Sequence, residues 1–166
     1  MRNLIAFPIL GLAVILQSSI VSQVQLVGGF ADLPLVLIAA WALQERVDTH
    51  WHWGALVCLF TFPISNLPIP VVIFGYFGVI ILGRILQRRI WQAPLLAMFS
   101  VVFIGTLFFH LLSFVVLRSL GTPLDIREVV GIITLPSLLL NMLLSIPMYA
   151  FMRDISYWVY PAEERA

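Results

Sequence analysis

Residues 94–117 read PLLAMFSVVFIGTLFFHLLSFVVL, an apolar run in which His110 is the one ionisable side chain. A helix crosses a bilayer with about 20 such residues, so this run predicts a membrane-spanning helix. Two further runs of the same kind occupy residues 71–86 and 129–152. Together the three runs indicate an integral membrane protein.

The composition of the whole chain supports this conclusion. Its 166 residues are 61% hydrophobic and 10% charged, and the net charge is +1. Nucleic-acid binding needs a broad basic surface, which this balance excludes. Cys58 is the only cysteine, so one chain forms neither an internal disulfide nor a cysteine-based zinc site. The length holds at most about six or seven spans, and we expect residues 1–166 to form a single integral membrane domain.

Three more apolar segments precede residue 71. Residues 4–21 form a run too long for the core of a signal peptide, so we expect it to be retained. The segments at about 33–43 and about 53–64 are short, nearer to the roughly 10–14 residues of a re-entrant segment than to a full crossing. We therefore predict an all-α, polytopic membrane bundle of six transmembrane helices, of which the second and third are short. A four-span arrangement, in which these two form a re-entrant hairpin, stays open.

The arginines predict the orientation of the bundle. With six spans both termini share one side, whose loops hold seven arginines, against two (Arg118 and Arg127) on the other side. The seven are Arg2, Arg46, Arg84, Arg88, Arg89, Arg153 and Arg165. Cytoplasmic loops are enriched in arginine, so we predict that the N- and C-termini are both cytoplasmic. A five-span arrangement would spoil this asymmetry.

Aromatic and basic residues at the predicted cytoplasmic helix ends are candidate membrane-interface anchors. All five tryptophans fall there, and indole rings favour the headgroup region. Arg84 and Arg88 share a helix face and could bind lipid phosphates or an acidic partner surface, although snorkelling to the interface is the favoured interpretation. The predicted anchors are Arg84, Arg88, Arg89, Trp41, Trp51, Trp53, Trp91 and Trp158.

The last run carries a stripe of small polar residues. Thr134, Ser137, Asn141 and Ser145 follow one another at spacings of 3, 4 and 4, which places them on one helix face. Such a stripe lets helices approach closely and exchange hydrogen bonds in lipid. We favour packing inside the same bundle, with a partner protein or a bound small molecule as the alternatives. Prolines at 136 and 147 are expected to bend this helix.

Two isolated polar residues have structural interpretations. Asp32 precedes the segment at 33–43 and is placed to cap its free amide groups, although an acid beside a short helix can also mark a site. His110 lies well inside the run at 94–117, and without a second ligand at a suitable spacing we expect it to be hydrogen-bonded rather than functional.

Signatures of catalysis and of metal binding are weak. His50 and His52 lie near Glu45 and Asp48, but this segment is interfacial and aromatic, so metal binding is disfavoured. The sequence holds no HExxH helix, no GxSxG elbow, no phosphate-cradling GxxxxGK loop and no pair of aspartates within the spans. We therefore expect no enzyme activity and no cofactor.

Three segments resemble the rod-shape-determining membrane protein MreD family. They are Leu16-Gln17-Ser18-Ser19, Ala31-Asp32-Leu33-Pro34 and Pro136-Ser137-Leu138-Leu139-Leu140-Asn141. The chain departs from the family pattern in two places. Ala31 stands where the family has a proline, and the third helix keeps Gly54 but has at best Asn66 where the family has an acid.

The resemblance implies a non-enzymatic scaffold of the cell-elongation (rod) machinery in the bacterial cytoplasmic membrane. In that family the protein works with the periplasmic protein MreC and other rod-complex subunits in cell shape and peptidoglycan synthesis. Membrane lipids are the other expected partners, and nucleic acid is not.

Two other interpretations stay open. The family is similar in architecture to the substrate-binding S components of energy-coupling-factor vitamin transporters, which makes such a component the main alternative. S components typically carry AxxxA docking motifs, whereas the first run here offers only Ala6 and Ala13, seven residues apart. An accessory subunit of another membrane complex is the third possibility.

Overall fold

The computed structural model describes residues 2–45, 47, 49–89 and 93–160. All regular elements among them are helical. In chain order they are η1 (Arg2–Ile5), α1 (Ala6–Ser19), η2 (Val21–Gln23), α2 (Leu33–Ala42), α3 (His50–Thr61), α4 (Ile69–Arg89), α5 (Pro94–Ser119), α6 (Ile126–Glu128), the π-helical η3 (Val129–Thr134) and α7 (Leu135–Val159).

Four helical stretches are long and apolar enough to cross a membrane: Ala6–Gln23, Ile69–Arg89, Pro94–Ser119 and Ile126–Val159. The helices α2 and α3 have only 10 and 12 residues. At about 1.5 Å per residue they span about 15 and 18 Å, roughly half of a hydrocarbon core of about 30 Å. The helices thus lie where the sequence places them, and the two short ones are short as predicted.

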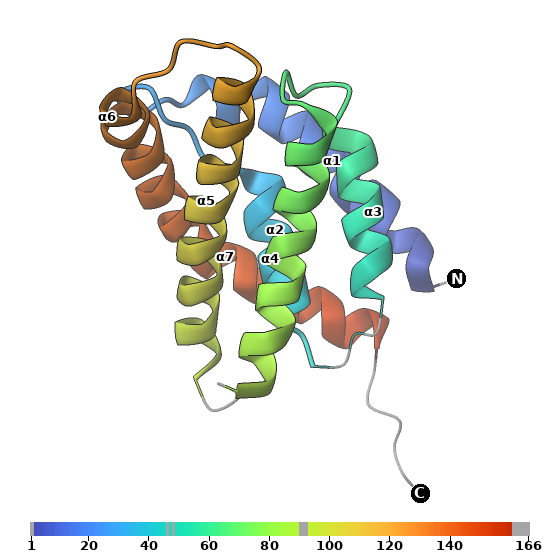
Figure 1. Cartoon of the computed structure of the whole chain (residues 1–166). Helices are drawn as coiled ribbons and strands as arrows, with labels where there is room; N and C mark the ends of the chain where they lie inside the picture. Colours follow the sequence, from blue (N-terminus) through green and yellow to red (C-terminus); the bar gives the residue numbers. More distant parts are fainter. Residues whose placement is uncertain (1, 46, 48, 90–92, 161–166) are drawn as a thin grey trace, which may run out of the picture.

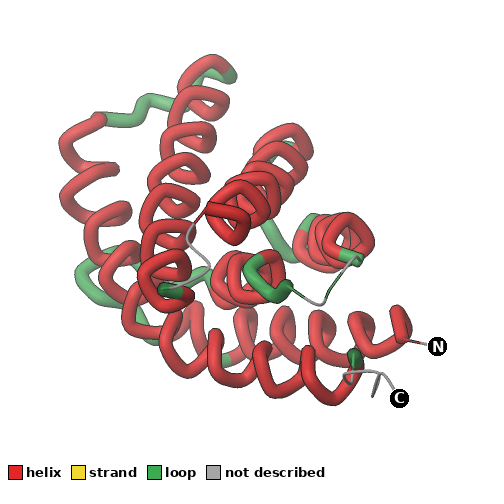
Figure 2. Tube along the Cα trace, turned by 90° about the horizontal axis from the view of Figure 1, so that it is seen from below, coloured by secondary structure: helices red, strands yellow, loops and turns green. Residues whose placement is uncertain are grey.

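The helices α1, α2, α3, α4, α5 and α7 run in alternating directions (Figure 1). The end of α4, the start of α5 and the end of α7 lie at one end of the bundle, together with Arg84, Arg88, Arg89 and Arg153. We call this the arginine-rich end. The start of α1 lies in the same half of the molecule as the end of α7, as Figures 1 and 2 both show.

The short helix α2 occupies the centre of the bundle. It contacts α1, α3, α4, α5 and α7, and all ten of its residues are buried. Its sequence, LPLVLIAAWA, is apolar on every face, which is the pattern of a helix surrounded by others. The longer helices cover it and present their exposed apolar side chains outward, as lipid contact requires.

Two of the predicted interface anchors are wrong. Trp41 and Trp53 are each 1% exposed, and their rings stack at 4.1 Å between centroids. Because α2 is central, a tryptophan near its end packs against α3 and not against headgroups. Trp51 and Trp158 are exposed and Trp91 lies outside the described residues.

The basic anchors also differ among themselves. Arg88 and Arg89 are exposed, whereas Arg84 is half-buried. The Arg84 guanidinium donates to Gln87 Oε1 at 2.9 Å and lies 3.4 Å from His50 Nε2. Arg84 therefore links α4 to α3 inside the bundle.

The helix around Pro136 departs from α geometry. Residues Val129–Thr134 directly before it are π-helical, and the Leu135 amide donates to the Val130 carbonyl five residues earlier. A proline has no amide hydrogen and its ring crowds the preceding turn, which a widened π turn accommodates. Pro147 lies inside α7.

Candidate functional site

The polar stripe faces the inside of the bundle. Thr134 is 5% exposed, Ser137 2%, and Asn141 and Ser145 0%. The stripe therefore does not face lipid, and packing within the bundle is the interpretation that the structure supports.

The stripe meets the segment at residues 28–33, which is irregular up to Asp32 and ends on the first residue of α2. This segment reaches the middle of the bundle, because it contacts Asn141, near the centre of the helical stretch Ile126–Val159, and Asn141 in turn bonds to Thr106, near the centre of α5. Irregular backbone at membrane depth is tolerated only where protein groups satisfy its amides and carbonyls. The polar residues of this region supply those partners.

Two side chains of α7 accept hydrogen bonds from the segment. The Phe30 amide donates to Ser137 Oγ at 3.1 Å, and the Asp32 amide donates to Asn141 Oδ1 at 2.7 Å. Asn141 Nδ2 donates to Thr106 Oγ1 of α5 at 3.0 Å. The predicted interhelical hydrogen bond of Asn141 is thus confirmed, and the same amide also holds the backbone of the segment.

Gln17 of α1 binds the segment from the other side. Its Nε2 donates to the Ala31 carbonyl at 2.9 Å, and its Oε1 accepts from the Leu33 amide at 2.8 Å. One carboxamide thereby satisfies the Ala31 carbonyl and the Leu33 amide, two residues apart. A neighbouring β-strand would pair with the same two backbone groups.

Asp32 caps α2, as predicted. Its Oδ1 accepts from the Leu35 amide at 2.9 Å, and the Tyr76 hydroxyl of α4 lies 3.4 and 3.5 Å from the two carboxylate oxygens. We refer to Gln17, Asp32, Ser137 and Asn141 together as the polar clamp.

Gly29 allows the segment to approach α7. A Cβ at this position would lie 2.5 Å from the Ile133 carbonyl oxygen and 2.7 Å from both the Ser137 amide nitrogen and Ser137 Oγ. Backbone atoms cannot move aside cheaply, so only glycine fits. The sequence shows the Gly28-Gly29 pair as a turn and gives no sign of this contact.

The other two members of the stripe have separate roles. Thr134 Oγ1 lies 3.0 Å from His110 Nδ1, which confirms the expected hydrogen bond of that histidine. Ser145 Oγ donates to the Met142 carbonyl of its own helix at 2.6 Å. Neither belongs to the polar clamp.

The metal hypothesis finds no support in the geometry. His50 is buried and lies beside Arg84, whereas His52 is exposed, so the two rings diverge. No group of three or more potential ligands occurs among the described residues, and Asp48 lies outside them.

Sequence reasoning missed Thr106 and Tyr76. Thr106 lies in an apolar run that also contains Ser100 and Ser113, whose hydroxyls donate to carbonyls of their own helix. Nothing local distinguishes the threonine that bonds across helices from the serines that do not.

The polar clamp has a structural role, because it joins parts of the same chain. Its donors and acceptors are directed at the chain itself, which fixes α1, α2, α5 and α7 relative to one another. No protein-family model, curated protein or solved structure matches the chain.

Proposed function

We propose that this protein is an MreD-like scaffold of the cell-elongation machinery, acting without catalysis in the bacterial cytoplasmic membrane beside an MreC-like partner. The observation that carries the proposal is the polar clamp. The three segments that resemble the family, at residues 16–19, 31–34 and 136–141, lie far apart in the sequence and meet there.

The convergence strengthens a resemblance that rests on short motifs. Short motifs in apolar sequences match one another easily, and the support for this resemblance is that its three segments meet in one place. Here Gln17 binds both Ala31 and Leu33, and Asn141 binds Asp32. One hydrogen-bonded unit therefore explains why these three segments occur together in one chain.

The same geometry argues against the S-component alternative. A transported substrate needs open space lined by groups that are free to bind it. The polar stripe would be the natural candidate for a substrate site. The segment leading into α2 packs against it, and Ser137 and Asn141 are already bonded to this segment.

Copurification tests the proposal. The protein is coexpressed with a single-span, MreC-like coiled-coil protein and extracted in mild detergent, with an unrelated single-span protein as the matched control. We expect the MreC-like protein alone to be retained. Equal retention of both, or recovery of ATPase subunits or a stoichiometric vitamin from the native host, would contradict the scaffold function.

A genetic test is independent of detergent. Depletion of the chain in a rod-shaped host is expected to give rounded cells, and re-expression to restore rods. Normal rods after complete depletion would argue against the proposal.

A further inference from the structure

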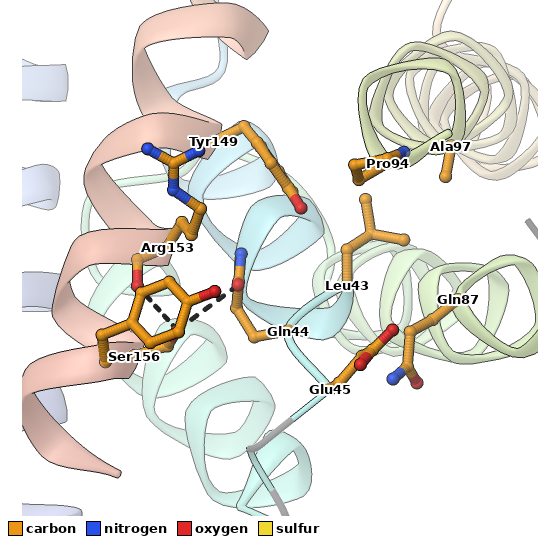
Figure 3. Close-up of a pocket in the computed structure, with 10 residues that line it drawn as sticks. Leu43, Gln44, Glu45, Gln87, Pro94, Ala97, Tyr149, Arg153 and Ser156 are labelled. Atoms are coloured by element: carbon orange, nitrogen blue, oxygen red, sulfur yellow. Dashed lines mark hydrogen bonds between the residues drawn. The ribbon is translucent and has the colours of Figure 1, made fainter. Parts of the chain in front are cut away.

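A cavity of about 290 Å³ lies at the arginine-rich end of the bundle (Figure 3), and no residue of the polar clamp lines it. Its walls come from the chain after α2, the end of α4, the first turn of α5 and the second half of α7. Ligand cavities usually measure about 300–1,000 Å³, so this one holds a small polar group and no more.

The cavity carries charges of both signs on opposite sides. In Figure 3 the Glu45 carboxylate lies beside Gln87, and Arg153 lies across the cavity. Glu45 forms no ion pair with another described residue, and the pair of Arg153 with Asp154 is a solvent-exposed contact of 3.4 Å. Separated opposite charges are complementary to a zwitterion.

The hydroxyl of a tyrosine with a buried ring points into the same space. Tyr149 is 9% exposed, and its hydroxyl is directed into the cavity (Figure 3). Within the described part of the chain this hydroxyl has no hydrogen-bond partner, although the ring is packed in the core. The hydroxyl itself is accessible from the cavity, so it is available to hydrogen-bond to a group that binds there.

The first turn of α5 adds a positive dipole end. Pro94 and Ala97 line the cavity, and the N-cap residue Ala93 has no side chain that could accept from the amides of this turn. No described side chain caps this N-terminus, and the N-terminus of a long helix attracts a phosphate.

We infer that this cavity binds the headgroup of an aminophospholipid of the phosphatidylethanolamine class. The phosphate lies at Arg153, the Tyr149 hydroxyl and the start of α5, and the ammonium lies at Glu45. A soluble phosphoethanolamine has the same charges, but the cavity lies where α4 ends and α5 begins, and the exposed Leu95 and Leu96 follow Pro94 directly. A lipid fits both features, because its acyl chains can contact those leucines.

Native mass spectrometry of the delipidated protein tests this inference independently of the scaffold function. The protein is titrated with phosphatidylethanolamine, phosphatidylcholine and phosphatidylglycerol that carry identical acyl chains. We expect phosphatidylethanolamine to bind about tenfold more tightly than the other two, because only its ammonium donates hydrogen bonds to a carboxylate.

Single substitutions identify the groups involved. Tyr149→Phe is expected to weaken phosphatidylethanolamine binding about fivefold to tenfold, and Glu45→Gln is expected to abolish the preference over phosphatidylglycerol. Arg89→Gln and Glu128→Gln are the matched controls, since both residues are exposed and lie outside the cavity. Thermal unfolding of each variant shows that it is folded.

Three outcomes would overturn the inference. Equal binding of the three lipids, or an equal loss in Arg89→Gln and Tyr149→Phe, indicates general lipid contact. Preference for phosphatidylglycerol would show that Glu45 does not bind the ammonium group. Competition by O-phosphoethanolamine at the concentration at which the lipid binds indicates a soluble ligand.

Discussion

Asn141 makes two contacts with one carboxamide, and only one of the two partners has an easy substitute. The Asp32 amide belongs to an irregular segment in the interior of the bundle, where no helical carbonyl is available to it. Thr106, by contrast, can turn its hydroxyl back to its own helix. The bond to the Asp32 amide is therefore the more costly one to lose.

We expect Asn141→Leu to lower the free energy of unfolding by about 1–2 kcal/mol, because it leaves a buried amide unsatisfied. This exceeds the average of about 0.6 kcal/mol for side-chain hydrogen bonds in membranes, since a backbone donor in irregular structure finds no other acceptor. Unfolding in detergent is the measurement. Asn66→Leu, at an exposed loop position, is the control, and equal stability of the two variants would contradict the prediction.

Gly29→Ala is expected to destabilise the protein by about 1–3 kcal/mol, because the new methyl group overlaps backbone atoms of α7. Gly11→Ala is the matched control. A Cβ at Gly11 meets nothing within 4 Å, and alanine is the better helix former, so its stability should be unchanged or raised. Thermal unfolding of both variants in the same detergent distinguishes them, and a tolerated Gly29→Ala would show that the segment lies farther from α7.

At the scale of elements, α2 shows what local sequence can and cannot predict. Its position, its shortness and the cap at Asp32 follow from an apolar run that begins after an acid. The stacking of Trp41 on Trp53 does not follow, because burial of a tryptophan depends on the helices around it. Similarly, the spacing of the polar stripe predicts a buried face but not that its partner is backbone 107 to 109 residues away.

Gln17→Leu is expected to loosen the segment leading into α2 without unfolding the protein. Gln17 bonds to two groups of this segment, so peptides covering residues 26–35 should exchange amide hydrogen about tenfold faster, whereas α4 and α5 should be unaffected. Hydrogen-exchange mass spectrometry measures this. Gln23→Leu, at an exposed position in η2, should leave exchange unchanged, and the same increase in both variants would count against the role of Gln17.

At the scale of the whole molecule, the alternating helix directions bring the arginines of α4 and α7 to one end of the bundle. The ends of α4 and α7, which hold Arg84, Arg88, Arg89 and Arg153, lie at the arginine-rich end, whereas the loops at residues 24–27, 62–68 and 120–125 lie at the opposite end (Figure 1). This arrangement does not depend on whether α2 and α3 are counted as crossings, because the pair enters and leaves at the same end. The positive-inside rule then predicts the same orientation for the six-span and the four-span arrangements.

Labelling of single cysteines tests that orientation. Cys58→Ala removes the only native thiol, and Val27→Cys then places one in the loop at residues 24–27, where Val27 is 78% exposed. Asp154→Cys places one near the end of α7, where the side chain is 72% exposed. We expect a membrane-impermeant thiol reagent to label Val27→Cys in intact cells, but Asp154→Cys only after permeabilisation, because arginine-rich ends stay in the cytoplasm. The reverse pattern would show that the bundle is inverted, and labelling of both in intact cells would show that α7 does not cross the membrane.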